Sequence, residues 1–364
     1  MSARRGFGSP DVACGILVMG HKIGGCGVTW KREVACDESG SDGENLTGGN
    51  TDVFAHASVR LSVESAAGHV QEIRDRIRSP AEEYKANHLL REKHRAVLEW
   101  LLAPAGPIHG HAHVHLTEKT FFVVDRAVDL LLGEGDGAGD TSGEAVTLFR
   151  EGRRTFGAER WREFLAAANQ LLRVRNDGDP QQPVDAFFRS VDSLRRAEPR
   201  PPVSGILDRL AATRSRADSY RAVVTGGPTL IPVLNPLLPA IVATAAHWSA
   251  DGRPVRLVHD RQNMLTPERI AWIEETARRA GAVLDGFRLV VAREDPRVQF
   301  ADFLAGVARR IASDELNGRG DPVLTALLRP YVDTASVWGD APSWARLGPA
   351  PGGTPVDSGV RSAG

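Results

Sequence analysis

Four acidic residues stand at places in this chain where a fold must either neutralise them or use them. Asp37 and Asp260 each end an apolar run that is typical of a β-strand. Glu83 stands in the first turn of an expected helix, and Asp302 lies inside an apolar helical run. Carboxylates in such places are costly unless they are paired or hold a metal. The sequence therefore predicts a fold that brings these four acids together.

The composition favours a globular protein. The chain has 364 residues, 42% of them hydrophobic, which is enough for one large domain or two ordinary ones. Its formal net charge of −1 gives the whole chain no electrostatic preference for nucleic acid. The three cysteines form no zinc or disulfide pattern, and the apolar run of residues 12–20 is too short to span a bilayer. We therefore expect a cytoplasmic protein with no membrane partner.

One stretch departs from this balance of charge. Residues 150–221 contain 15 arginines, no lysine and 10 acidic residues, a net charge of +5. Such a stretch could bind the phosphates of a nucleic acid, either DNA or RNA. It could equally form solvated helix faces, as charge runs commonly do.

The apolar periodicity alternates between the strand and the helix repeat. Strands are expected at residues 51–63, 108–116, 254–260 and 287–291. Helices are expected at residues 80–102, 237–248, 266–281 and 297–313, with a further helical stretch over residues 145–221. This order predicts an α/β fold, a mixed sheet flanked by helices. We expect a peripheral segment at residues 1–31, one domain over residues 32–344 with a helical insertion at about 133–221, and a disordered tail at residues 345–364.

Several short motifs together resemble the bacterial domain of unknown function 3800 family, which is placed among the ribonuclease H-like folds. Residues 37–40 match the Asp-Glu-Ser-Gly that ends the family's first strand. Residues 83–85 match its Glu-apolar-Lys element, and Lys119 matches a lysine that follows a later strand. Asp260 matches the acid at the end of a late strand. Residues 299–306, which begin with Gln299, match the Gln-x-Ala-Asp-x-Leu-Ala-Gly of the final helix.

The resemblance implies a ribonuclease H-like sheet and a nuclease that depends on Mg²⁺ or Mn²⁺. In such enzymes carboxylates hold divalent metals that activate water and stabilise the leaving oxygen of a phosphodiester. By this resemblance Asp37 would bridge the metals, and Asp260 and Asp302 would complete the coordination. Glu83 would bind one metal or orient water, and Glu38 is a weaker candidate ligand. Lys85 is expected either to contact a phosphate or to pair with a neighbouring glutamate.

Simpler interpretations of the same acids stay open. Asp37 and Asp260 could be ordinary strand-end acids that shape a turn, and Glu83 could be a first-turn acid favoured by the helix dipole. In that case the fold would serve as a non-catalytic module that binds nucleic acid or protein.

A third hypothesis rests on His109, His111, His113 and His115. On a strand, four alternating histidines project from one face, and such a row can bind zinc in a metal hydrolase. A zinc ligand set usually needs a distant acid or histidine as well, and no familiar hydrolase pattern stands near. We favour a polar strand face.

Overall fold

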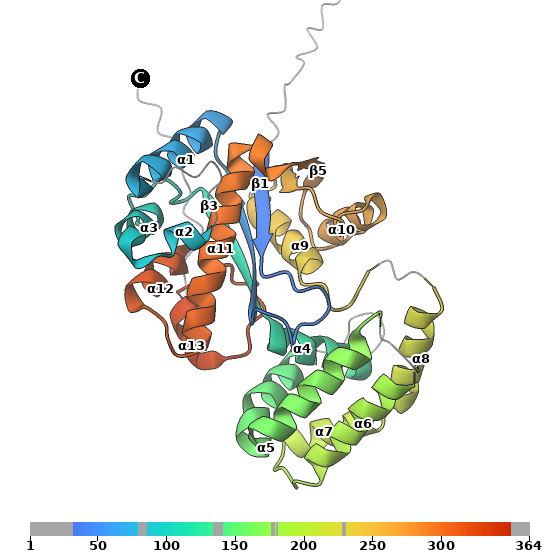
Figure 1. The fold of residues 1–364 in the computed structure, drawn as a ribbon. Coiled ribbons are helices and arrows are strands. Elements are labelled where there is room, and N and C mark those ends of the chain that lie inside the picture. The colour runs from blue at the N-terminus through green and yellow to red at the C-terminus, as the bar shows by residue number, and fades with distance from the viewer. Residues whose placement is uncertain are drawn as a thin grey trace, which may run out of the picture. The chain divides into compact units, whose positions relative to one another are not determined.

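A computed structural model describes residues 32–78, 86–133, 141–175, 179, 181–227 and 231–350 of the protein. These residues form an α/β fold in which helices cover both faces of a five-stranded mixed sheet (Figure 1). The strands are β1 (Arg32–Ser39), β2 (Val53–Val59), β3 (Ala112–Glu118), β4 (Val255–Asp260) and β5 (Leu284–Val290). Their order across the sheet is β3-β2-β1-β4-β5. Strands β1, β2 and β3 run antiparallel to their neighbours in that series, whereas β4 and β5 run parallel to β1.

One face of the sheet packs against the long helix α11 (Pro296–Leu316), which crosses it in Figure 1. Ala35, Ala57 and Val258 point to this side, in keeping with the alternation of side chains along a strand. Shorter helices complete this layer: α1 (Val63–Ile77), α2 (Ala86–Leu89), α3 (Arg95–Leu102), α12 (Pro322–Leu328) and α13 (Ala341–Leu347).

The opposite face packs against α9 (Leu237–Trp248) and α10 (Pro267–Arg279). Val34, Cys36, Phe54 and Leu257 point to this side. Adjacent residues of β1 therefore face different layers, so Asp37 belongs to the α11 side and Glu38 to the α9 side.

A separate helical core occupies the region of the expected insertion. It is built by α4 (Lys119–Leu132), α5 (Thr141–Leu172, interrupted at Gly157), α6 (Gln182–Arg195), α7 (Val203–Ala211) and α8 (Arg214–Thr225). Phe164, Phe187 and Leu207 are fully or almost fully buried in this core. The stretch expected to be helical is helical in the structure, and α4 extends it toward the sheet.

Several expected boundaries differ from the structure, including those of β3, expected at residues 108–116, and of β5, expected at residues 287–291. The strand expected up to residue 63 ends at Val59, because Ser62 caps α1 by accepting a hydrogen bond from Ser65 N at 3.0 Å. The helix expected over residues 80–102 is broken into α2, a 3₁₀ turn (Glu92–His94) and α3. The expected tail begins too early, since Leu347 in α13 is fully buried. Residues 1–31, the expected peripheral segment, and residues 351–364 lie outside the described residues.

The loop between β1 and β2 is attached to the start of α4 by a buried lysine. Lys119 is fully buried, and its ammonium group donates hydrogen bonds to Asp42 and to the Thr51 hydroxyl. Asp42 also accepts from the backbone and the hydroxyl of Thr51. At the start of the loop, Gly40 has φ +90°, and a Cβ there would lie 2.4 Å from the carbonyl oxygen of Val53.

We predict that Lys119→Met destabilises the protein by about 3 kcal/mol, because it leaves the half-enclosed carboxylate of Asp42 without its partner. Urea unfolding measures the change, and Lys93→Met, at an exposed lysine, is the matched control. Adding Asp42→Asn to Lys119→Met should recover part of the loss. Equal stabilities of the two lysine variants would contradict the role assigned to Lys119.

Candidate functional site

The acids at the ends of β1 and β4 stand side by side. The two strands are parallel, and their register pairs Cys36 with His259. Asp37 and Asp260 are the next residues of each strand, so both lie at the same carboxyl edge of the sheet. Both also share the side-chain direction of Ala35 and Val258, which points toward α11. Open sheets with parallel strands bind ligands at this kind of edge.

Helix α11 adds Asp302 to this edge. α11 packs along β1 and β2, and the charge of Asp302 acts directly on Asp37. The small residues after Asp302 permit close packing: a Cβ at Gly306 would lie 2.3 Å from the Cβ of Ala86 in α2 and 3.9 Å from the Ser39 hydroxyl. These small residues therefore allow α11 to approach its neighbours closely, with α2 the nearest.

The electrostatics of Asp37 set it apart from an ordinary strand-end acid. Its side chain is 7% exposed. Burial, together with repulsion by Glu38, Asp302 and Asp260, raises the pKa of Asp37 to about 9. A hydrogen bond of 2.8 Å from Glu38 N to Asp37 Oδ1 opposes this rise only in part. In the metal-free protein, Asp37 is therefore protonated at neutral pH.

Two of the expected site residues, Glu83 and Lys85, lie outside the described residues. Among the residues that are described, no three His, Cys, Asp or Glu side chains form a group able to hold a metal ion. Asp260 and Asp302 both repel the charge of Asp37, but the three aspartates do not form a ready-made ligand set.

Glu38 lies at the boundary between the two layers. It accepts a hydrogen bond from Gln262 Nε2 at 3.0 Å and lies 3.8 Å from His259 Nε2. Burial raises the pKa of Glu38, although His259 and Gln262 oppose the rise. Glu38 also helps to raise the pKa of Asp37 by repulsion. Its carboxylate therefore couples the α9 side of the sheet to the acidic edge, by which we mean the carboxyl edge that bears Asp37, Asp260 and Asp302.

Gln299 and Lys119 have structural partners. Gln299 Nε2 donates to the carbonyl oxygen of Arg293 at 3.0 Å, and Asp260 Oδ1 accepts from Ala292 N at 2.8 Å. The side chains of Gln299 and Asp260 therefore hold the turn that follows β5. Lys119 is committed to Asp42 and Thr51, so it positions the loop after β1.

The prediction that four histidines share one strand face is wrong, because β3 begins only at Ala112. His109 and His111 lie in the preceding turn and are exposed. His113 and His115 are buried on the α9 side, and Asp333 Oδ2 lies 3.0 Å from His113 Nε2 and 3.7 Å from His115 Nδ1.

Two further buried histidines, His56 and His259, lie on the same side of the sheet. His56 Nε2 lies 3.3 Å from His259 Nε2, and His56 Nδ1 lies 2.9 Å from the Thr244 hydroxyl. Asp333 is the distant acid that the sequence pattern did not reveal. Although burial opposes it, His113 and His115 hold the pKa of Asp333 well below its usual range.

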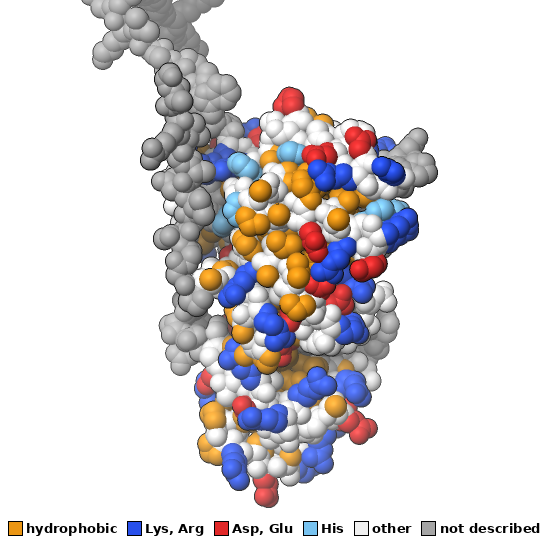
Figure 2. Space-filling view, turned by 90° about the vertical axis from the view of Figure 1, so that its left-hand side faces the viewer, with side chains coloured by type: hydrophobic (Ala, Val, Ile, Leu, Met, Phe, Trp, Pro, Cys, Tyr) orange, Lys and Arg blue, Asp and Glu red, His pale blue; other side chains and the backbone are white. Residues whose placement is uncertain are grey.

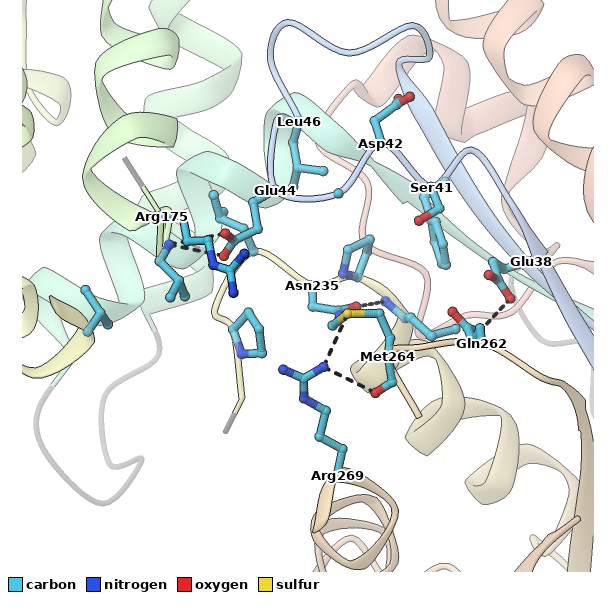
Figure 3. Close-up of a pocket in the computed structure, with 18 of the residues that line it drawn as sticks. Glu38, Ser41, Asp42, Glu44, Leu46, Arg175, Asn235, Gln262, Met264 and Arg269 are labelled. Atoms are coloured by element: carbon cyan, nitrogen blue, oxygen red, sulfur yellow. Dashed lines mark hydrogen bonds between the residues drawn. The ribbon is translucent and has the colours of Figure 1, made fainter. Parts of the chain in front are cut away.

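A cavity of about 930 Å³ opens beside Glu38 (Figure 3). Its walls combine the loop after β1, the segment after α5, the end of α8, and the segments that lead into α9 and α10. Three arginines line it: Arg175, Arg221 and Arg269. In Figure 3, Arg175 and Arg269 reach into the same space from different segments. Pockets of about 300–1,000 Å³ are typical of small-molecule sites.

The arginine-rich stretch does not form one continuous basic surface on the face shown in Figure 2, where Lys and Arg side chains of the lower half are scattered among other types. Several arginines of this stretch are paired with acids: Arg195 with Asp208, and Arg214 with Asp185. Arg216 donates to the carbonyl oxygens of Leu131 and Gly133. These arginines therefore bind acids or carbonyl oxygens within the helical core. The others on the face shown in Figure 2 are dispersed over its surface.

None of the described helices is both long and apolar enough to cross a membrane. No protein-family model, curated protein or solved structure matches the chain. The resemblance to the domain of unknown function 3800 family therefore stays a prediction, and the function is inferred from the residues and their geometry.

We predict that Asp37→Asn stabilises the metal-free protein at pH 8 by about 1–3 kcal/mol and has little effect at pH 4. The folded-state pKa of Asp37, about 9, lies above its usual value of 3.8, so folding favours the protonated form. Wild-type stability should therefore fall as the pH rises between these values, whereas asparagine carries no such cost.

Urea unfolding in EDTA at both pH values measures this difference. Asp314→Asn is the control, since Asp314 lies on the same helix as Asp302 and pairs with Arg310 at 2.6 Å. A stabilisation by Asp37→Asn that is equal at both pH values would contradict the titration of Asp37.

Proposed function

We propose that the protein is a ribonuclease H-like, divalent-metal-dependent nuclease that hydrolyses phosphodiesters at the edge formed by Asp37, Asp260 and Asp302. The observation that carries this proposal is the position of Asp37 beside Asp260 at the carboxyl edge of β1 and β4, where the charges of Asp260 and Asp302 repel that of Asp37. A fold gains no stability from like charges gathered at one place, so their juxtaposition is best explained by a cation that they share.

The donor chemistry fits Mg²⁺ or Mn²⁺, because carboxylate oxygens are the ligands these ions prefer. Asp37, Asp260 and Asp302 would hold the ion, and Glu83 is retained as an expected further ligand. When bound, the metal would activate water and stabilise the leaving oxygen. Because the described residues form no ready-made group of three ligands, the carboxylates would come together only on binding.

The chain's own residues prepare this edge in two ways. Glu38 N donates to Asp37 and fixes the direction of its carboxyl group. Asp260 and Gln299 hold the turn after β5, which borders the same edge. Neither contact involves a bound ligand, so both are present before the substrate arrives.

A second candidate function is a non-catalytic module that binds nucleic acid on the same fold. The adjacent cavity with its three arginines favours this alternative as much as it favours a nuclease. A zinc hydrolase built on residues 109–115 receives less support, because His109 and His111 are separated from His113 and His115 by the start of β3.

We predict Mn²⁺- or Mg²⁺-dependent cleavage of DNA or RNA by the wild type, and its loss by about a hundredfold or more in Asp37→Asn and Asp302→Asn. Both variants keep the size of the side chain, so folding should be intact. The assay uses single- and double-stranded forms of both nucleic acids and an EDTA control.

Asp314→Asn should retain wild-type activity, since it changes the same helix outside the proposed site. Full activity in Asp37→Asn would exclude that carboxylate as a metal ligand. Binding of nucleic acid by the wild type without cleavage under any metal would favour the non-catalytic module.

A further inference from the structure

The cavity beside the acidic edge carries positive charge at its rim. Arg175 is exposed there and has no hydrogen-bond or ion-pair partner among the described residues. Arg269 extends from α10, and its Nη1 lies 3.4 Å from the Met264 carbonyl oxygen and 3.3 Å from the Met264 sulfur. A guanidinium group carries five N–H donors, so Arg269 can keep its contacts within the protein and still donate to an anion. Both arginines can therefore contribute to binding an anionic ligand.

Arg221 supplies a third positive charge from the depth of the cavity. Its side chain is 3% exposed, and Nη1 donates to the carbonyl oxygens of Leu171 and Arg173, at the end of α5. Its Nε atom is buried without a hydrogen-bond partner among the described residues. Burial lowers the pKa of Arg221, although the charges of Tyr220 and Glu44 oppose this change.

The acids that line the same cavity are engaged elsewhere. Asp42 is paired with Lys119, and Glu44 accepts from Val174 N at 3.2 Å. Glu38 is held by Gln262. Within the described part of the wall, none of these three carboxylates forms an ion pair with Arg175 or Arg221. The cavity therefore favours an anion over a cation.

The remaining lining and the size of the cavity restrict the kind of anion. Val174, Pro232 and Met264 are partly exposed and provide an apolar floor beside the arginines, against which a nucleobase can pack. A volume of about 930 Å³ has the dimensions of a small-molecule pocket. It can take one or two nucleotides of a single strand, whereas the width of a double helix exceeds it.

We propose that this cavity binds single-stranded nucleic acid, with its phosphates on Arg175 and Arg269 and a base on the apolar floor. The proposal rests on the nuclease function proposed above and names its substrate class. The cavity reaches Glu38, which follows Asp37 in β1, so a strand held in the cavity can continue to the acidic edge. Guanidinium groups suit this task, because they bind phosphate oxygens through two parallel hydrogen bonds.

The test measures binding apart from cleavage. Fluorescence anisotropy in EDTA follows labelled oligonucleotides about ten nucleotides long, as single-stranded DNA, single-stranded RNA and duplex DNA. We expect the wild type to bind single strands more tightly than duplex. Arg175→Gln and Arg269→Gln together should weaken single-strand binding by about tenfold or more. They should also reduce the salt dependence of binding, by about 0.7 in slope for each phosphate that the variant no longer neutralises.

The matched control is Arg153→Gln with Arg160→Gln, which removes two exposed arginines of α5 outside the cavity. It should bind as the wild type does. Arg175→Gln alone keeps the test valid if the double variant is unstable, because Arg175 is exposed and forms no hydrogen bond or ion pair with the described residues.

Equal affinity of the cavity variant and the wild type would overturn the proposal, as would a preference for duplex. Equally tight binding of a free nucleoside monophosphate would also overturn it, by showing a nucleotide site instead of a strand site. Cleavage that persists with undiminished single-strand binding in the cavity variant would reject only this inference. Cavity-dependent binding with no cleavage under any metal would reject only the nuclease function.

Discussion

The parallel pairing of β1 with β4 joins two segments that are far apart in the chain, and the position of the acidic edge depends on it. The register that sets Val34 against Leu257 also sets Asp37 beside Asp260. Because strand side chains alternate between faces, a slip of one residue would turn Asp260 toward α9 and away from Asp37. The apolar residues that precede each acid prevent such a slip, since they would lose their places in the two layers. The core therefore specifies the geometry of the site.

The loop after β1 connects the sheet to the helical core through hydrogen bonds. Asp42 in the loop is held by Lys119 at the start of α4, and Leu46 N donates to Asn169 Oδ1 of α5 at 2.8 Å. Glu44 of the same loop accepts from Val174 N, just after α5. The loop thus forms one wall of the cavity while it fastens the sheet to the helices, and the shape of the cavity follows from structural contacts.

Strands and helices could be predicted from the sequence where a local pattern determines them. The strand before Asp260, the helices α9 and α10, and the core helix around Asp302 were predicted because their caps and apolar repeats are unambiguous, as in the Thr266 cap of α10. Helix α1 was missed, since the alternation of β2 was extended through Val63 past the cap at Ser62.

The features that depend on distant segments could not be predicted. The cluster of His56, His113, His115 and His259 requires the pairing of β2 with β3 and of β1 with both β2 and β4. It also requires Asp333, from a segment near the end of the chain. The cavity takes its lining from six separated segments, and no spacing in the sequence identifies Arg175 and Arg269 as neighbours.

The strand order also has a consequence for folding. Strands β1, β2 and β3 pair as a local antiparallel series, but β1 meets β4 only after the whole helical stretch from α4 to α9 has been passed. Contacts between such distant segments form late and slowly, because a long loop must first be closed. Asp37 belongs to the early part of the sheet, whereas Asp260 and Asp302 belong to the part that completes it. The acidic edge therefore forms only when the last strands and α11 dock, so a partly folded chain lacks the edge on which the proposed function depends.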